Sequence, residues 1–580
     1  MQDDFRLSEK LTINAGIRYE YELGQHEVNN KFNVGFSPTA PISYTNSAGS
    51  TQNLLGGLLF AGVNGAPTHC CNNSHVKFSP RIGMALQVSK DTVVHAGYGF
   101  FYAPVGITTS YNQGYAQATQ PSITTPGTST AIPTTAIGPG ACLSNPFFQS
   151  VAGATCGGGL LQPSGNSLGS LTGLGGSLTV FDKGRQYPLV QQYMMDVQHK
   201  FPHDFIVTVS YVGTHSSNFP LSVNINQMPD STLASAYANN QNLNTNSLSS
   251  GTVNPYYAST IGGLPTTGVV ANKTSLPIGQ TYLPFPYYQS ITEVKSVGFG
   301  WYNSAVIKAE KRMSNGMTLL ATYTHASNWD NIYGGIGTQT TTTSGPQDNT
   351  NLGPEFARSL DSVPNRATLA ITEVLPFGKG RRFLSNPTGF FGHLTDVLVG
   401  GWQVNYEQLV SNGVPLTVTQ SDVSTHFGPT GTGGSVQRPT LINGDPHSAC
   451  LSGRPQNRLG AYLNGGAFTA TQAYQYGNSP RTLPCRAPGY DTATASLNKD
   501  LFTFHERFKL QYRIEALNLY NTPQFATPGT TLNVGSFGAT PTALSSFSGT
   551  AGTKNYGGLG TLSSQAGFGR IIQMGGRVTF

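Results

Sequence analysis

A two-residue periodicity of apolar side chains is the feature that most constrains how this chain can fold. In LTINAGIRYEYE, residues 11–22, every second side chain from Leu11 to Tyr21 is apolar, and those between are polar, charged or glycine. Successive side chains of a β-strand point to opposite faces, so the pattern predicts a strand with one apolar face. The same alternation occurs at the carboxyl terminus, where every second residue from Ile572 to Phe580 is apolar or glycine. Chain ends usually fray, so a terminal Phe580 needs an apolar surface to lie against.

Segments with this alternation recur along the whole chain. There are twelve, namely 11–22, 80–89, 92–103, 189–201, 205–214, 300–312, 316–326, 366–376, 401–410, 491–501, 507–520 and the terminal strand. Such a series predicts an all-β protein with about twelve visible strands.

The connections between these segments alternate in length. The tight links, which carry polar or turn-forming residues, are 90–91, 202–204, 314–315 and 504–505. The long stretches are 23–79, 104–188, 215–299, 327–365, 411–490 and 520–567. The link after Leu375 is of intermediate length and falls where a short one is expected. Strands of about 9 to 11 residues, with short turns at one end and long loops at the other, are typical of an antiparallel transmembrane β-barrel of the bacterial outer membrane.

Composition agrees with a lipid environment. Only 10% of residues are charged, against about 25% in an ordinary soluble domain. Aromatic residues make up 10% of the chain, which argues against simple disorder. No apolar run reaches the roughly 18 to 20 residues of a membrane-spanning helix. The net charge of +6 is small for this length and no basic cluster follows a helix, so nucleic-acid binding has no support.

A soluble β-sandwich is the competing interpretation, since its strands also alternate. Sandwich strands are mostly shorter and their outer faces carry more charge. Loops of some 80 residues are also uncommon in compact domains. These points favour the membrane barrel, with the apolar face of each strand against the lipid bilayer.

Eight segments, in the order in which they occur, resemble the barrel of TonB-dependent outer-membrane receptors, and most of all the Oar-like branch. They span residues 2–580 and are QDDFRLSEKLTINAGIRYEYE, FSPRIGMALQVSKDTVVHAGYGFFYAP, SYVGTHSSNFP, PFPYYQSI, VPNRATLAITEVLPFGKGRRF, GGWQVNYEQLVSNGVPLTV, RIEALNLYNTPQF and FGRIIQMGGRVTF. The resemblance implies that residues 1–580 are the carboxy-terminal portion of a larger barrel of about 22 strands. The plug and amino-terminal domains would be absent. The opening MQDDFRLSEK lacks the basic start and apolar core of a secretory signal, which also predicts an incomplete chain.

The function implied by this resemblance is ligand binding at the long extracellular loops and energy-coupled uptake across the outer membrane. The implied partners are the TonB, ExbB and ExbD energy-transducing proteins, acting through the missing amino-terminal parts. The outer-membrane assembly machinery would read the terminal strand ending in Phe580. The alternative is a surface adhesion protein without transport, and the loops carry no motif that identifies a ligand.

The polar faces of the predicted strands collect charged and ionisable groups. They are Arg18, Glu20, Arg81, His95, Lys308, Glu310, Arg312, Lys509, Arg513, Glu515 and Arg577. We expect them to line the barrel interior, paired with neighbours across strands, rather than to form a solute site.

Six cysteines lie in the predicted long loops. Because disulfides persist outside the cell, we predict that Cys142 bonds Cys156 and Cys450 bonds Cys485. The run HCCNNSH, residues 69–75, suggests a metal site, but adjacent cysteines lack the separation usual for zinc ligands. A loop disulfide or free thiols at Cys70 and Cys71 are the preferred interpretation, and no metal or cofactor is expected. No nucleophile-and-base arrangement, phosphate-binding glycine loop or HExxH motif is present, so we expect no enzymatic activity.

Overall fold

A computed structural model describes most of the chain. The described residues are 2–21, 26, 29, 32–69, 77–103, 165–239, 251–257, 270, 273–314, 316–332, 345–420, 437–469, 471, 474–504, 508–532 and 558–580. No helix in these ranges is long and apolar enough to cross a membrane.

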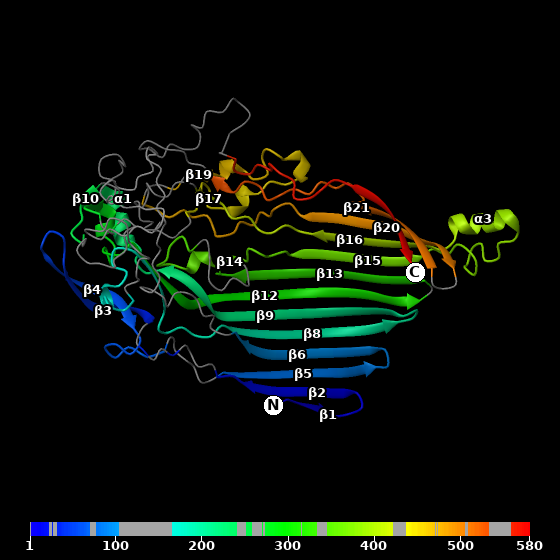
Figure 1. Cartoon of the computed structure of the whole chain (residues 1–580), viewed down its shortest axis with the longest axis horizontal. Coiled ribbons are helices and arrows are strands. Elements are labelled where there is room, and N and C mark those ends of the chain that lie inside the picture. The colour runs from blue at the N-terminus through cyan, green and yellow to red at the C-terminus, as the bar shows by residue number, and fades with distance from the viewer. Residues whose placement is uncertain are drawn as a thin grey trace, which may run out of the picture.

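One large sheet dominates the structure, with thirteen strands hydrogen-bonded in sequence order from β1 to β23 (Figure 1). These strands are antiparallel to their neighbours and comprise β1 (Gln2–Arg6), β2 (Leu11–Tyr19), β5 (Phe78–Ser89), β6 (Thr92–Tyr102), β8 (Leu189–Phe201), β9 (Phe205–Asn224), β12 (Ser290–Ser314), β13 (Met317–Asp330), β15 (Asn365–Val374), β16 (Trp402–Ser411), β20 (Tyr490–Phe504), β21 (Phe508–Leu517) and β23 (Ile571–Thr579). Two short strands join at its margin, namely β7 (Ser177–Phe181) on β12 and β14 (Ala357–Arg358) on β13.

All twelve strands predicted from the alternation are confirmed, in the predicted order. β1 was missed because its five residues, QDDFR, contain a single apolar side chain. β9 and β12 are longer than predicted, at 20 and 25 residues. About 9 to 11 residues span the bilayer in such strands, so both continue beyond it into the loops.

The strand register places the apolar sets of successive strands on one face of the sheet. One row of directly paired residues crosses nine strands, namely Leu11, Leu86, Val94, Val197, Val209, Ile307, Tyr323, Ala367 and Val410. A second row joins Val404, Leu497, Ile514 and Met574. We call this side of the sheet the apolar face. It is the side predicted to contact lipid.

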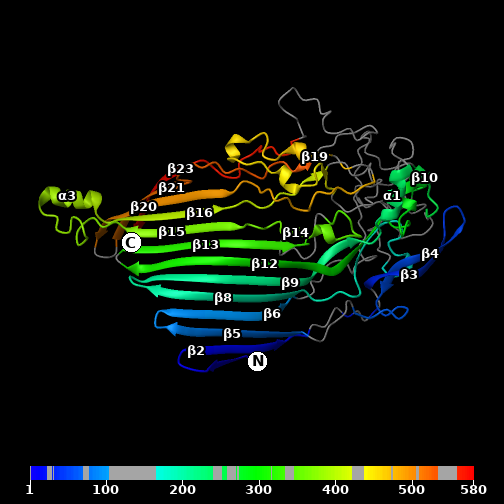
Figure 2. The same ribbon diagram turned by 180° about the vertical axis from the view of Figure 1, so that it is seen from behind.

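The two ends of the sheet differ as predicted. Tight turns join β5 to β6 and β8 to β9 at one end, and the long connections gather at the other end (Figures 1 and 2). The intermediate link between β15 and β16 contains a helix that the alternation did not predict, α3 (Gly389–Val399), at the short-turn end. In barrels of this type the short turns are periplasmic and the long loops extracellular.

The long connections contain the remaining elements. These are β3 (Asn33–Thr45), β4 (Thr51–Phe60), α1 (Asp230–Asn239), β10 (Gly251–Val253), β11 (Ser275–Pro277), α2 (Ile278–Thr281), β17 (Thr419–Gln420), β18 (Thr440–Leu441), β19 (Phe468–Thr469), β22 (Thr531–Leu532) and the 3₁₀ turns Gly169–Leu171, Gly353–Glu355, Pro446–Ala449, Pro455–Asn457 and Gly465–Ala467.

Candidate functional site

The long connections fold around two hydrophobic cores at the extracellular end. The first, which we call the N-side assembly, packs the β3–β4 hairpin and β7 against Tyr287, Tyr288 and Ile291. The second, the C-side assembly, packs Leu416, Leu441, Phe468, Leu483 and Leu532 with nine further buried residues. Fully burying one such side chain contributes about 1.5 to 3 kcal/mol, so each core stabilises a defined loop structure. The apolar residues of the C-side core are spaced irregularly, so alternation does not reveal them. In the β3–β4 hairpin the buried residues do alternate, but only over short stretches, as at Ile42 and Tyr44 and at Leu58 and Phe60.

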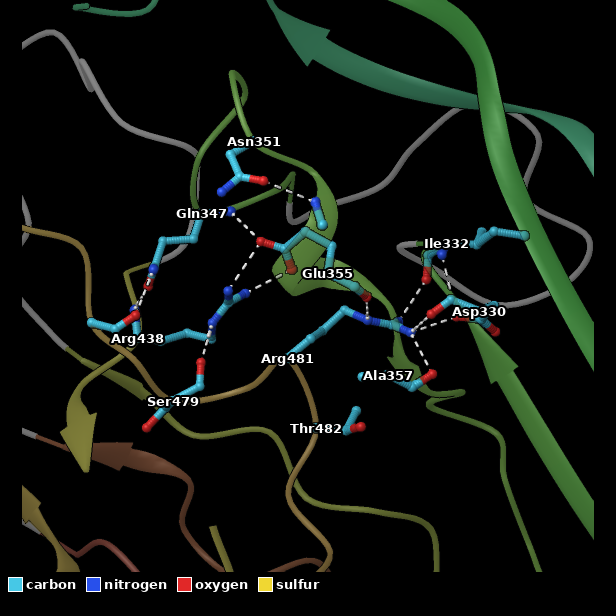
Figure 3. A network of polar contacts seen from close by, with 12 residues as sticks. Asp330, Ile332, Gln347, Asn351, Glu355, Ala357, Arg438, Ser479, Arg481 and Thr482 are labelled. Atoms are coloured by element: carbon cyan, nitrogen blue, oxygen red, sulfur yellow. Dashed lines mark hydrogen bonds and ion pairs between the residues drawn. The ribbon is translucent and has the colours of Figure 1, made fainter. Parts of the chain in front are cut away.

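A buried ion pair joins the C-side assembly to the loop segment 345–364 (Figure 3). The guanidinium of Arg438 donates to both carboxylate oxygens of Glu355, at 2.7 and 3.0 Å. The Arg438 Nε–H also donates to the Ser479 carbonyl at 2.8 Å, and the Gln347 backbone N–H donates to Glu355 Oε1 at 3.0 Å. The charges are therefore satisfied on both sides, as a buried pair requires.

A second buried arginine, Arg481, ties the C-side assembly to the end of β13. Its guanidinium donates to Asp330 Oδ1 at 2.5 Å. It also donates to the backbone carbonyls of Glu355 and Ile332, each at 2.8 Å. Several carbonyls are thus bound by one planar group, a geometry that a lysine ammonium does not reproduce. Next to it, the Thr482 hydroxyl donates to the Arg358 carbonyl at 2.9 Å, so the described segments 345–364 and 474–489 are joined at several points.

A disulfide joins Cys450 to Cys485, the pairing predicted from the sequence, with the two Cα atoms 5.2 Å apart. Cys485 is buried in the C-side core, and its carbonyl accepts a hydrogen bond from the Leu416 N–H at 3.0 Å. The bond therefore fastens the segment around Cys450 to the buried part of the assembly. Cys142 and Cys156 lie outside the described residues.

The metal hypothesis falls largely outside the described part of the chain. Of the four candidate metal ligands, only His69 lies in the described residues. Its backbone forms an isolated β-bridge with His26. Cys70, Cys71 and His75 are not described. Elsewhere in the described ranges, no three acidic, histidine or cysteine side chains are grouped as metal ligands.

A polar junction connects the two assemblies. The Gln227 amide nitrogen donates to Asp348 Oδ1 at 2.7 Å and to the Tyr476 hydroxyl at 3.0 Å. Its amide oxygen accepts from the Asn349 backbone N–H at 2.7 Å. Asp230 lies beside Asp348, and burial, with the charge of Asp348, raises the pKa of the Asp230 carboxyl. Gln227 is buried and its amide is fully hydrogen-bonded, so it holds the three loops together. The Asp230 carboxylate is exposed and that of Asp348 is half-buried, and these two groups suit hydrogen-bond donors on a polar solute.

Tyrosines concentrate in the N-side assembly. The Tyr256 and Tyr287 rings pack edge to face with centroids 5.8 Å apart. The Tyr44 hydroxyl donates to the Tyr256 carbonyl at 3.1 Å. Burial raises the pKa of Tyr287 to about 12, with a further contribution from Tyr256. These phenols are held neutral within the core rather than presented as reactive groups.

The predicted interior charges lie on the polar face, and several of them form ion pairs, but mostly along one strand rather than across strands as expected. Arg18 binds Glu20 at 2.7 Å, and Lys308 binds Glu310 at 2.8 Å. His95 pairs with Asp196 on the neighbouring strand at 3.1 Å. Pairing across strands thus holds for His95, whereas the pairs of Arg18 and Lys308 follow their own strands. Phe580 follows β23 and is 98% exposed.

Sequence reasoning missed Glu355, Arg438 and Arg481. They lie in loops without periodicity, and the paired partners are 83 and 151 residues apart. The one available signal is the rarity of charge in this chain. A charged residue within a loop of otherwise uncharged residues is therefore a candidate for a buried ion pair.

Solved structures of outer-membrane proteins are similar to this chain. The outer membrane transporter YddB from Escherichia coli is 10% identical with a TM-score of 0.40, over 100% of this chain and 52% of that one. The FrpB iron transporter from Neisseria meningitidis is 9% identical with a TM-score of 0.33, over 100% and 53%. The siderophore receptor PiuA from Acinetobacter baumannii is 9% identical with a TM-score of 0.34, over 91% and 39%.

The chain therefore spans about half or less of the length of these structures. No protein of curated function matches it. The model of the family described as "Outer membrane beta barrel domain" matches residues 1–573, almost the entire chain. The chain accordingly belongs to the outer membrane β-barrel domain family and is a protein of the bacterial outer membrane.

Proposed function

We propose that this chain forms the carboxy-terminal wall and outer mouth of a TonB-dependent receptor and transporter of the Oar-like branch. The observation that carries the proposal is the folded state of the extracellular end. Two hydrophobic cores, a disulfide and two buried arginine–carboxylate pairs hold the described parts of the long connections in fixed positions. A receptor requires such a surface, because groups ordered before binding do not lose conformational freedom when the ligand arrives.

In this mechanism the barrel performs no chemistry. The outer assemblies bind a large solute, and the carboxylates of Asp230 and Asp348 at the polar junction are the groups best placed to hydrogen-bond it. The sheet then acts as a rigid wall while a plug, supplied by amino-terminal parts of the protein, moves and opens the path. The energy comes from the TonB, ExbB and ExbD proteins acting on those parts.

A larger barrel is part of the proposal. β1 and β23 stand at the two ends of the described strand order, where further backbone groups need partners. Each unpaired backbone group costs several kcal/mol in hydrocarbon. We therefore propose that preceding strands complete a barrel of about 22 strands. The outer-membrane assembly machinery would pair with β23, whose last apolar side chains lead to the exposed Phe580.

Uptake by cells carrying the intact parent gene tests this function. Wild-type and deletion strains are compared for accumulation of radiolabelled ferric chelates, cobalamin and oligosaccharides, each with and without a protonophore. We expect accumulation of at least one solute to be lost on deletion and to be lost equally with the protonophore or in a strain without TonB. If deletion leaves all uptake intact but reduces attachment to surfaces or other cells, the protein is an adhesin and the transport proposal is wrong.

A further inference from the structure

Helix α3 (Gly389–Val399) exposes an unusual amount of apolar surface. It projects beyond the short-turn end of the sheet, between β15 and β16 (Figures 1 and 2). Phe390 and Phe391 are 76% and 79% exposed. A contiguous exposed apolar patch on a membrane-associated protein marks a site of interaction.

A helix of a soluble protein turns its apolar side to the core, whereas α3 turns its polar side to the rest of the protein. At about 100° per residue, Phe390, Leu394 and Val397 share one side, and Gly392 and Asp396 lie on the other. The Asp396 side is turned to the protein, because Asp396 Oδ1 accepts a hydrogen bond from the Lys379 backbone N–H at 2.8 Å. A Cβ atom at Gly392 would likewise lie 3.2 Å from the Pro387 backbone carbon. The apolar side therefore faces away from the chain.

The carboxyl end of α3 is fastened to the sheet. The Trp402 indole N–H donates to the Leu398 carbonyl at 2.8 Å. The Lys499 ammonium donates to the Gly400 carbonyl at 2.6 Å and also to the Val397 carbonyl. A cation suits this end of a helix, where unpaired carbonyls carry partial negative charge. The helix consequently has a fixed position relative to the strands.

That position continues the apolar face. Trp402 and Lys499 are direct partners in the register of β16 and β20, two residues from the pair Val404 and Leu497 of the apolar face. The side chains of Trp402 and Lys499 lie on the same side of the sheet, since alternate residues share a face. The end of α3 thus covers the short-turn margin of the surface that contacts lipid, and its bound carbonyls satisfy the charge of Lys499.

Charge around α3 also fits a membrane surface. The loop before the helix exposes Lys379, Arg381 and Arg382, whereas Asp396 is the one acidic residue between 376 and 400. An apolar helix face combined with basic residues is typical of segments that lie in the headgroup region of a bilayer. Basic side chains at that depth attract anionic lipids.

We propose that α3 is an interfacial anchor, with its apolar side inserted among phospholipids of the periplasmic leaflet and Lys379, Arg381 and Arg382 bound to their anionic headgroups. The anchor fixes the depth of β15 and β16 in the membrane. It depends on the outer-membrane location of the barrel and is independent of whether the protein transports a solute.

Fluorescence quenching in bilayers tests the anchor. The intact protein, with the preceding strands that complete its barrel, is folded into vesicles of phosphatidylethanolamine and phosphatidylglycerol, with or without bromine on the acyl chains. The variant Phe390→Trp places a probe on the apolar side, and His393→Trp places a matched probe on the flank of the same helix. The signal of the native tryptophans is subtracted. We expect brominated lipid to quench the Phe390→Trp probe at least about twofold more than the His393→Trp probe.

The basic residues are tested with the triple variant Lys379→Gln, Arg381→Gln, Arg382→Gln in the Phe390→Trp background. We expect its quenching no longer to increase with the phosphatidylglycerol fraction. Equal quenching of both probes by aqueous iodide, with no effect of bromine, would place the helix in water and overturn the proposal. If neither brominated lipid nor iodide quenches the Phe390→Trp probe, and this protection grows with the protein-to-lipid ratio, a second copy of the protein covers the apolar side of α3 and the proposal is wrong.

Discussion

Arg438 and Glu355 are 83 residues apart in the sequence and form a two-pronged ion pair in which the side chains are 3% and 1% exposed. A pair this deeply buried is costly to break, because the remaining charge keeps no counter-charge and has lost its water. The pair joins 345–364 to 437–469, so the shape of the C-side assembly depends on both residues being present.

The first prediction concerns this pair. Arg438→Met leaves the Glu355 carboxylate buried without its counter-charge, and we expect the C-side assembly to be destabilised by about 3 to 5 kcal/mol. Removing both charges together, in Arg438→Met with Glu355→Leu, should recover most of that loss. Pulse proteolysis of the detergent-folded protein in a urea series measures the change.

The matched control is Lys200→Met. Lys200 pairs with Asp204 at 3.7 Å, and both side chains are more than half exposed. Exposed pairs contribute about 0 to 1 kcal/mol, so this variant should behave as the unmodified protein. Equal stability of Arg438→Met and Lys200→Met would show that the buried pair does not hold the loops together.

The strands could be predicted from sequence because the environment of a membrane strand is local and regular. Lipid on one side and the interior on the other impose alternation on each strand separately, as in Leu11 to Tyr19 and in Leu510 to Ala516. The alternation also identified the apolar face. A register shift of one residue would move all apolar side chains of a strand to the opposite face, so the pattern fixes which residues share a face. β1 could not be predicted in this way, because its five residues include a single apolar side chain and therefore show no alternation.

The extracellular end could not be predicted in the same way. Arg438 and Arg481 pair with residues of other loops, far away in the sequence. The spacing of residues within one loop does not predict which loops will pack together. α3 was missed for a different reason. Its apolar residues follow a helical period, within a link that the strand alternation marks only by its intermediate length. The cysteine pair at 450 and 485 was predictable because few cysteines were available to pair.

A second prediction concerns the disulfide between Cys450 and Cys485. Peptide mapping by mass spectrometry without reducing agent should recover the two residues in one linked species. The bond closes a separation of 35 residues, for which the loss of loop entropy in the unfolded chain corresponds to about 3 to 4 kcal/mol. The double variant Cys450→Ala with Cys485→Ala should therefore lower the urea midpoint of the C-side assembly. The same map tests the pair predicted for Cys142 and Cys156, and free thiols at either pair would contradict that assignment.

A third prediction follows from the pKa of Tyr287, which burial in the N-side assembly raises to about 12. The ordinary value is about 10, so as the pH rises the unfolded chain loses this proton before the folded chain does. The stability contributed by the protonated phenol is fully present below about pH 10 and is lost as the pH rises towards 12. We expect the N-side assembly to open over this range.

Alkaline titration followed by tyrosinate absorbance, in parallel with proteolysis of the β3–β4 hairpin, measures the transition. Tyr287→Phe should make proteolysis less dependent on pH over this range. The control Tyr282→Phe removes an exposed phenol and should leave the profile unchanged. A profile that is the same for Tyr287→Phe and the unmodified protein would show that this phenol is not linked to opening.

The last prediction uses two neighbouring residues of β12 to distinguish the faces of the sheet. Ile307 pairs with Val209 and Tyr323 in the apolar row, is 47% exposed, and is expected to contact lipid. Ile307→Arg should therefore destabilise the inserted barrel by roughly 2 to 4 kcal/mol if the site is near the bilayer midplane. Val306 is adjacent but points to the polar face, between Ser210 and Thr324, where a charge can be hydrated or paired. Val306→Arg should change stability by less than about 1 kcal/mol. Urea unfolding from phospholipid vesicles compares the two variants directly. A larger loss for Val306→Arg than for Ile307→Arg would mean that lipid covers the opposite face of the sheet.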